Sequence, residues 1–87
     1  RQPNHRDALI NIGICLYKLG KLSESIQQYN KCIQMMPNNG RIYYLRALVY
    51  AQGNDFSNAY ADAQKATLLG MQMNPQQVAQ WKTNAGL

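Results

Sequence analysis

An internal repeat with a period of 34 residues constrains this chain more than any other feature of its sequence. In both copies, apolar or small residues recur at steps of three or four, the spacing that places side chains on one face of an α-helix. These residues are Leu22, Ile26, Tyr29 and Ile33 in the first copy, and Phe56, Tyr60, Ala63 and Thr67 in the second. A similar spacing precedes each set, so each copy predicts two helices.

Small residues and turn formers follow the same period. Gly13, Ser25 and Cys32 of the first copy correspond to Ala47, Ala59 and Ala66 of the second. A small side chain in mid-helix lets a second helix approach closely, so we expect these positions to be buried. Gly20 corresponds to Asn54, and both residue types tolerate a left-handed backbone well. Each copy therefore predicts a helix–turn–helix unit.

The boundaries of these units can be read from capping residues. We place the four helices near residues 6–19, 23–36, 40–52 and 56–69. Asn38 or Asn39 is expected to cap the third helix, and Asp55 or Ser57 the fourth, by accepting a backbone N–H hydrogen bond. Pro37 follows the second helix, where it prevents further helix.

The last 14 residues, 74–87, depart from the repeat. Asn74 suits a helix cap and Pro75 the first helical position, so we expect a helix of about ten residues that stops before Gly86. Trp81 falls at the position that Gly13 and Ala47 occupy in the two copies. We interpret the segment as a capping helix in which Val78 and Trp81 cover the end of the stack; the alternative is the start of a third repeat in shifted register.

The whole pattern resembles the tetratricopeptide repeat, which has the same period and the same placement of small residues. The residues that carry the resemblance are Leu9, Ile12, Gly13, Leu16, Ser25, Tyr29 and Pro37 in the first copy, and Tyr43, Arg46, Ala47, Tyr50, Ala59, Ala63 and Met71 in the second. Arg46 departs from the large apolar residue of the family pattern, and Met71 from its closing proline. The resemblance covers residues 6–73.

The resemblance implies an all-α fold, a right-handed α–α superhelix of antiparallel helix pairs with about five helices. We expect one helical-repeat domain over 1–87, with a first repeat at 6–39, a second at 40–73 and the final segment at 74–87. About three repeats are usually needed for independent stability. The first helix is apolar on several sides, as buried helices are. We therefore expect further helices ahead of Arg1 in a longer parent protein.

Composition and charge narrow the class of protein. Apolar residues make up 46% of the chain, but no run is long enough to span a membrane and no secretion signal is present. We therefore expect an intracellular, cytoplasmic protein in which Cys15 and Cys32 are reduced and packed. The net charge of +5 is scattered along the chain. Lys21, Lys31 and Lys65, on or near the second helices, form either a solvated surface or a footprint for RNA or another polyanion.

No set of residues predicts catalysis. His5 is the single histidine and is expected ahead of the first helix, and the acidic residues have no spacing typical of acid–base chemistry. Asp7 and Glu24 suit the positive starts of helices. His5 and the two cysteines lack the short spacings of a zinc site, and no glycine-rich phosphate loop occurs. We predict a protein that is not an enzyme and that needs no cofactor or metal.

The resemblance implies instead a concave groove lined by the first helix of each repeat. The groove residues are expected to be Ile10, Asn11, Ile14, Tyr17, Lys18, Arg41, Tyr44, Leu45, Leu48 and Gln52. Because the predicted floor is apolar and partly aromatic, an extended or helical protein segment with Leu, Phe or Met anchors would suit it. Alternatively, Ile10 and Ile14 pack against an upstream helix of the parent chain, which leaves no groove function for this part.

One branch of the family binds the acidic C-terminal tails of heat-shock chaperones. It uses two lysines, two asparagines and an arginine as a clamp on the terminal carboxylate. The matching positions here are Ile10, Ile14, Leu45, Pro75 and Ala79, so the clamp is missing.

The function we predict is a protein-interaction scaffold within a larger complex, with a peptide, a helix of another subunit or adjoining repeats as the partner. Nucleic acid is the alternative partner, on the basic face, and we expect no membrane association. The remaining alternatives are a purely structural segment and an accessory segment of an enzyme whose active site lies elsewhere.

Overall fold

A computed structural model describes residues 5–87. In this range the chain forms five α-helices and no β-strand. The helices are α1 (His5–Lys18), α2 (Leu22–Met35), α3 (Gly40–Gln52), α4 (Phe56–Leu68) and α5 (Pro75–Asn84). The all-α class is thus confirmed, and each predicted helix lies within one residue of its expected bounds. His5 is a correction, because it is the first residue of α1 and not part of a preceding loop.

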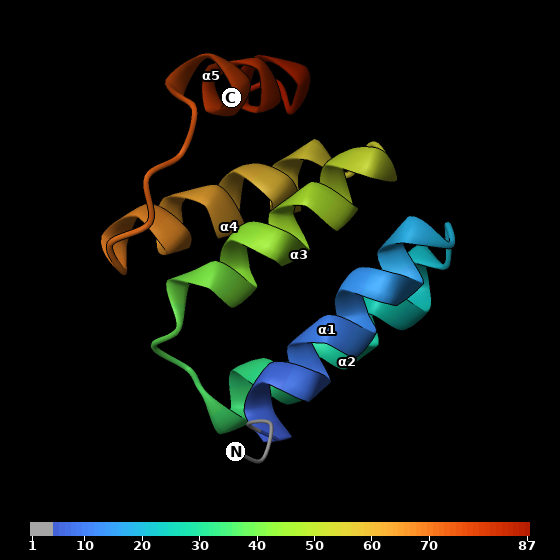
Figure 1. The fold of residues 1–87 in the computed structure, drawn as a ribbon. Helices are drawn as coiled ribbons and strands as arrows, with labels where there is room; N and C mark the ends of the chain where they lie inside the picture. The colour runs from blue at the N-terminus through green and yellow to red at the C-terminus, as the bar shows by residue number, and fades with distance from the viewer. Residues whose placement is uncertain (1–4) are drawn as a thin grey trace.

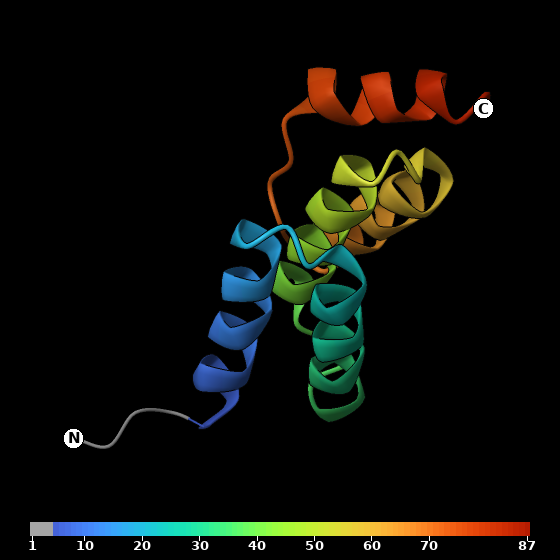
Figure 2. The same cartoon turned by 90° about the vertical axis from the view of Figure 1, so that its right-hand side faces the viewer.

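The helices stack in chain order (Figure 1). α1 pairs with α2, α3 pairs with α4, and α3 also packs on α2, which joins the two pairs. α5 packs mainly on α4. Turned by 90°, the molecule shows α1 at one end of the stack and α5 across the other (Figure 2). The stack is elongated, with principal dimensions of 44 × 27 × 19 Å. Among the helices of residues 5–87, α1 and α5 therefore each have a side that no other described helix covers.

The turns within the two pairs have the predicted left-handed residues. Gly20 has a φ of +78° and Asn54 a φ of +62°, and Asn54 is the single non-glycine residue with positive φ among those described. Each lies two residues past the end of its helix and reverses the chain within three residues. Both turns therefore close by the same backbone geometry, with Gly in one repeat and Asn in the other.

Side-chain caps start three of the helices. Asn39 Oδ1 accepts a hydrogen bond from the Arg41 N–H at 3.0 Å, and Asn74 Oδ1 accepts one from the Gln76 N–H at 2.9 Å. Asp55 Oδ1 accepts a longer one from the Asn58 N–H, at 3.4 Å. The predicted caps at these positions are confirmed. Lys21 precedes α2 and provides no side-chain cap.

Two apolar clusters form the core. The first gathers Ile10, Tyr29, Cys32, Ile42 and Val49 from α1, α2 and α3. The second gathers Ala47, Ala59, Ala63 and Trp81 from α3, α4 and α5, and Val78 packs against it. Gly13, Ala47, Ala59 and Ala66 are all buried, as their small size predicts. Trp81 and Val78 cover the end of the second pair, also as predicted.

One thiol differs from expectation. Both cysteines are free, and Cys32 is buried, but Cys15 is exposed on α1 and not packed. The expectation for Cys15 came from the number of cysteines alone, and Cys15 lies on a side of α1 that no other described helix covers. Among the scattered basic residues, Arg1 lies outside the described part of the chain.

Candidate functional site

The ten predicted groove residues lie on α1 and α3, but they differ in how accessible they are. Asn11, Lys18, Arg41 and Gln52 are exposed; Ile14, Tyr17, Tyr44, Leu45 and Leu48 are half-buried; Ile10 is buried. Ile10 is 2% exposed and belongs to the first core cluster, so it has no surface to offer a partner. We name the nine accessible residues the α1–α3 face.

The α1–α3 face has an apolar floor fixed by the core. Ile14, Tyr17 and Leu45 pack against the first cluster, and Leu48 packs against the second. A side chain held from below keeps its rotamer, so a partner that contacts it loses little conformational entropy. The exposed cations of this face are Lys18 and Arg41. The arrangement suits apolar contact with a polar rim.

A hollow at the ends of α1 and α3 brings three of the predicted residues together. Tyr17 and Lys18 come from the last turn of α1, and Gln52 from the last residue of α3. They share a hollow of about 440 Å³ with Gly20 of the turn between α1 and α2 and with Leu22, the first residue of α2. The remaining predicted residues lie along the two helices and are not among the residues that line this hollow.

Contacts beneath this face fix the spacing of α1 and α2. The Ser25 hydroxyl donates to the Gly13 carbonyl at 2.7 Å, and Gln28 Nε2 donates to the Leu9 carbonyl at 3.1 Å. The Tyr29 ring lies directly against Gly13. Burial raises the pKa of Tyr29 to about 12, partly offset by hydrogen bonding to Ser25. The phenol is therefore neutral at physiological pH and acts as packing, not as an acid.

An ion pair that sequence analysis missed joins α3 to α4. Arg46 Nε and Nη2 donate to the two Asp62 oxygens, each at 2.7 Å, and Arg46 Nη1 donates to Asn30 Oδ1 of α2 at 2.8 Å. The guanidinium also lies 5.6 Å and 5.7 Å from the ring centroids of Tyr43 and Tyr50. The hydrogen bonds to Asp62 raise the pKa of Arg46.

The signal for this ion pair was present in the sequence. Arg46 interrupts an apolar stripe, and Asp62 is the one acidic residue in the middle of the fourth predicted helix. The sequence prediction treated Arg46 as a departure from the family pattern. In the structure it instead connects three helices, because its long side chain reaches Asn30 on one side and Asp62 on the other.

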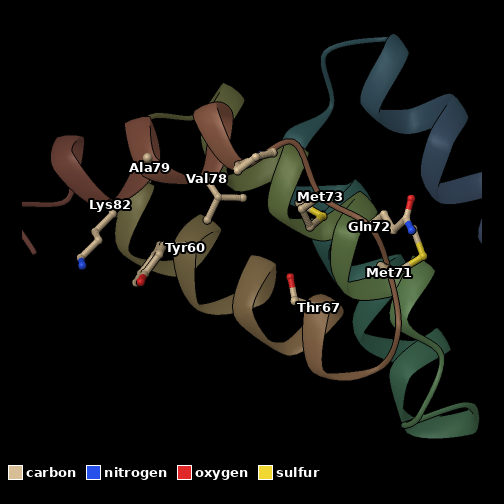
Figure 3. A pocket seen from close by; sticks show the side chains of 9 residues that line it. Tyr60, Thr67, Met71, Gln72, Met73, Val78, Ala79 and Lys82 are labelled. Atoms are coloured by element: carbon tan, nitrogen blue, oxygen red, sulfur yellow. The ribbon is translucent and has the colours of Figure 1, made fainter.

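A second hollow, also absent from the predicted sites, lies between α4 and α5 (Figure 3). It has a volume of about 690 Å³ and is lined by Tyr60 and Thr67 of α4, Val78 and Lys82 of α5, and the methionine-containing connection between them. The connection from α4 to α5 covers 69–74, whereas that from α2 to α3 covers 36–39. Met71 meanwhile reaches back to Gly40, where an added Cβ would lie 2.9 Å from Met71 Cγ.

The described residues carry no grouping typical of a metal centre. Within 5–87, no three His, Cys, Asp or Glu side chains lie close enough together to hold a metal ion. In the same range, each helix is too short or too polar to cross a bilayer. Every buried side-chain nitrogen or oxygen found there has a hydrogen-bond partner.

Comparison with protein families gives two overlapping matches. A family model described as a TPR repeat matches residues 13–53. A second, described as a tetratricopeptide repeat, matches residues 40–69. Together they extend over both helix pairs except for the first turns of α1. No curated protein matches the chain.

Proposed function

We propose, from the premise that this chain belongs to the tetratricopeptide repeat family, that it binds a partner protein through the α1–α3 face. Repeats of this family generally mediate protein–protein interaction and typically do so without catalysis of their own. The observation that carries the proposal is the shared hollow of Tyr17, Lys18 and Gln52, which joins residues from both repeats.

The chemistry of the α1–α3 face favours a segment with apolar anchors. Ile14, Leu45 and Leu48 give a floor that gains about 25 cal/mol per Å² of apolar surface removed from water. Tyr17 and Tyr44 add large contact area at low entropy cost. Lys18 and Arg41 favour an acidic residue beside the anchors. We therefore expect Leu, Phe or Met side chains flanked by Asp or Glu, in an extended or helical segment.

The same chemistry disfavours a free chaperone C-terminus. Of the five clamp positions, Ile10 is buried, Ile14 and Leu45 pack on the core, and Pro75 and Ala79 carry no donor. A carboxylate that loses water there gains no hydrogen bond in return. A titration with a chaperone-tail peptide should give no measurable binding. Micromolar affinity that disappears when the terminal carboxylate is amidated would contradict this.

A site-directed photo-crosslink tests the proposed face. A benzophenone amino acid replaces Tyr44 on α3, or Tyr60 on α4 as the matched control, since both tyrosines are half-buried but lie on different helices. The partner should crosslink at position 44 and not at 60. A partner that crosslinks equally at both positions, or at 60 alone, would overturn the choice of face.

The salt dependence of the captured partner's affinity separates protein from polyanion binding. Apolar contacts barely change between 50 and 200 mM salt, whereas a polyanion site with six to ten phosphate contacts weakens about 10³- to 10⁵-fold. Substitution of exposed Lys21, Lys31 and Lys65 by Glu should leave the affinity of the α1–α3 face within about twofold. A steep loss of affinity, either on these substitutions or with rising salt, would favour the polyanion alternative.

A further inference from the structure

The junction between the two helix pairs contains the one Asn–Gly pair of the sequence, Asn39–Gly40. Asn39 is the N-cap of α3 and Gly40 is its first residue. Asparagine followed by glycine is the residue pair most prone to spontaneous deamidation, because glycine has no side chain to hinder attack by its own backbone nitrogen. Neither residue belongs to the α1–α3 face, so this site is independent of the function proposed above.

Packing explains why the second residue of this pair is glycine. The start of α3 lies beside the end of α4 (Figure 1). A Cβ added at Gly40 would lie 2.9 Å from Met71 Cγ, 3.0 Å from Leu69 Cβ and 3.2 Å from the Ala66 carbonyl oxygen. Gly40 is buried and its φ is not positive. The space at this contact therefore requires glycine, whereas the backbone conformation does not.

Capping explains why the first residue of the pair is asparagine. Asn39 Oδ1 accepts a hydrogen bond from the Arg41 N–H at 3.0 Å, and the Asn39 carbonyl accepts one from the Ile42 N–H at 3.2 Å. Asparagine is among the best residues for such a cap. The cap of α3 and its close contact with α4 thus place a chemically unstable pair at the junction.

The folded geometry keeps the reacting atoms apart. Deamidation requires the Gly40 nitrogen to reach Asn39 Cγ. Asn39 has an extended backbone, with φ/ψ of −91°/101°, which places the Gly40 nitrogen and Asn39 Cβ on opposite sides of the Cα–C bond. Rotation about this bond would break the hydrogen bond from Arg41 and move Gly40 against Met71. The reaction therefore requires the start of α3 to separate from the end of α4.

We propose that Asn39 is a deamidation site that the fold protects and that reacts when the start of α3 separates from α4. The Gly40 nitrogen loses its proton to water or hydroxide and forms a bond to Asn39 Cγ. The bond from Cγ to the side-chain nitrogen breaks, and that nitrogen leaves as ammonia. Water then adds to either carbonyl carbon of the resulting succinimide and opens the ring to aspartate or isoaspartate.

The two products have opposite effects on the junction. Aspartate keeps a side-chain oxygen as the cap and adds a negative charge at the positive start of α3, which is favourable. Isoaspartate carries the backbone through Cβ, which adds one carbon before Gly40 and converts the carbonyl that bonds Ile42 into a free carboxylate. Gly40 has no space to accommodate the longer backbone. Isoaspartate therefore prevents the start of α3 from closing on α4 again.

The rate of deamidation in the folded and the unfolded protein tests the site. The protein is incubated in mildly alkaline buffer, with and without enough urea to unfold it. Trypsin releases residues 32–41, and fragment masses separate Asn39 from exposed Asn38, the internal control. Deamidation at Asn39 should be at least about tenfold slower in the folded protein. Rates within about twofold of each other overturn the protection, and no reaction at Asn39 in urea overturns the site.

Two variants locate the opening. Met71→Ala removes the Cγ that covers Gly40, whereas Met73→Ala changes a half-buried methionine of the same connection that is not among the nearest neighbours of Gly40. Without urea, deamidation at Asn39 should rise at least about threefold in Met71→Ala and stay within about twofold in Met73→Ala. Circular dichroism checks folding, and a lower temperature is used if a variant is partly unfolded. Equal acceleration in both variants, or none in Met71→Ala, overturns the proposed opening.

Discussion

The two repeats solve the same packing problem with different side chains. In α1 and α2, Gly13 lies against the ring of Tyr29, so one partner has no side chain and the other is large. In α3 and α4 the corresponding residues are Ala47 and Ala63, both buried in the second cluster. The two side chains at this contact must together fill the space between the paired helices. One large side chain can do so opposite a glycine, or two small side chains can share the space.

The repeats also differ in the polar contacts that fix each pair. In the first pair, Gln28 donates to the Leu9 carbonyl, and in the second the corresponding Asp62 holds Arg46. The side chain of Arg46 is 19% exposed and that of Asp62 is 8% exposed. The first repeat thus uses a neutral bond to the backbone, whereas the second uses a mostly buried ion pair that also reaches α2.

The largest loss of stability should come from a substitution that disrupts the contact between Gly13 and the Tyr29 ring in the first repeat. In Gly13→Ala, the new Cβ would lie 2.5 Å from Tyr29 Cε1, and the ring is buried and has no space to move. We expect a loss of about 3 kcal/mol in the free energy of unfolding, at the upper end for overpacking. Urea unfolding measures it. The control is Gly53→Ala, where the nearest atom is 3.6 Å away and the change should cost less than about 1 kcal/mol.

The two repeats should also differ in how their stability depends on pH, because Tyr29 of the first repeat titrates and the corresponding Ala63 of the second does not. The pKa of Tyr29 rises from 10.0 to about 12 on folding, so the folded state favours the protonated phenol. Its contribution is complete below pH 10 and is lost as pH rises from 10 to 12, by up to about 3 kcal/mol. Unfolding curves for the native protein and Tyr29→Phe should converge or cross over this interval. A difference that stays constant from pH 9 to 12 would show that Tyr29 is not desolvated.

The ion pair of the second repeat gives a smaller effect, because part of Arg46 remains in water. Asp62→Ala leaves the guanidinium with Asn30 as its remaining hydrogen-bond partner and should cost about 2 kcal/mol. Arg46→Leu should cost a similar amount, since Asp62 is then buried without a cation. The double variant should lose less than the sum of the two, which a double-mutant cycle measures. Strict additivity would mean that the pair contributes no coupling.

A substitution that gives α2 the same cap as α4 should have the smallest effect on stability. Lys21 and Asp55 occupy equivalent positions before α2 and α4, with φ/ψ of −86°/71° and −91°/74°. Asp55 caps α4 but Lys21 does not cap α2. Lys21→Asp should therefore add a cap and stabilise the protein by about 1 kcal/mol in thermal unfolding. Lys21→Ala serves as the control for loss of the charge alone and should stay within about 0.5 kcal/mol.

The α1–α3 face could be predicted only in part. Helical spacing identified Tyr17, Lys18 and Gln52 correctly as residues of α1 and α3, but it also selected Ile10, which is buried. Ile10 and Ile14 are four residues apart and project from nearly the same side of α1. Which of them is covered depends on how far α2 and α3 extend over that side, and spacing along one helix carries no information about this.

The positions of the helices, their ends and the close contacts at small residues could all be read from the amino-acid sequence. Period, caps and left-handed turn residues are local, since each acts within a few residues of its own position, and Asn39, Asp55, Gly20 and Asn54 behave as their chemistry dictates. Two features depend on how the helices pack and could not be read from the sequence: Arg46 connects three helices, and Ile12 faces solvent. Equivalent positions in the two repeats have the same backbone conformation but different neighbouring helices. α3 packs between α2 and α4, whereas α1 lies at the end of the described stack.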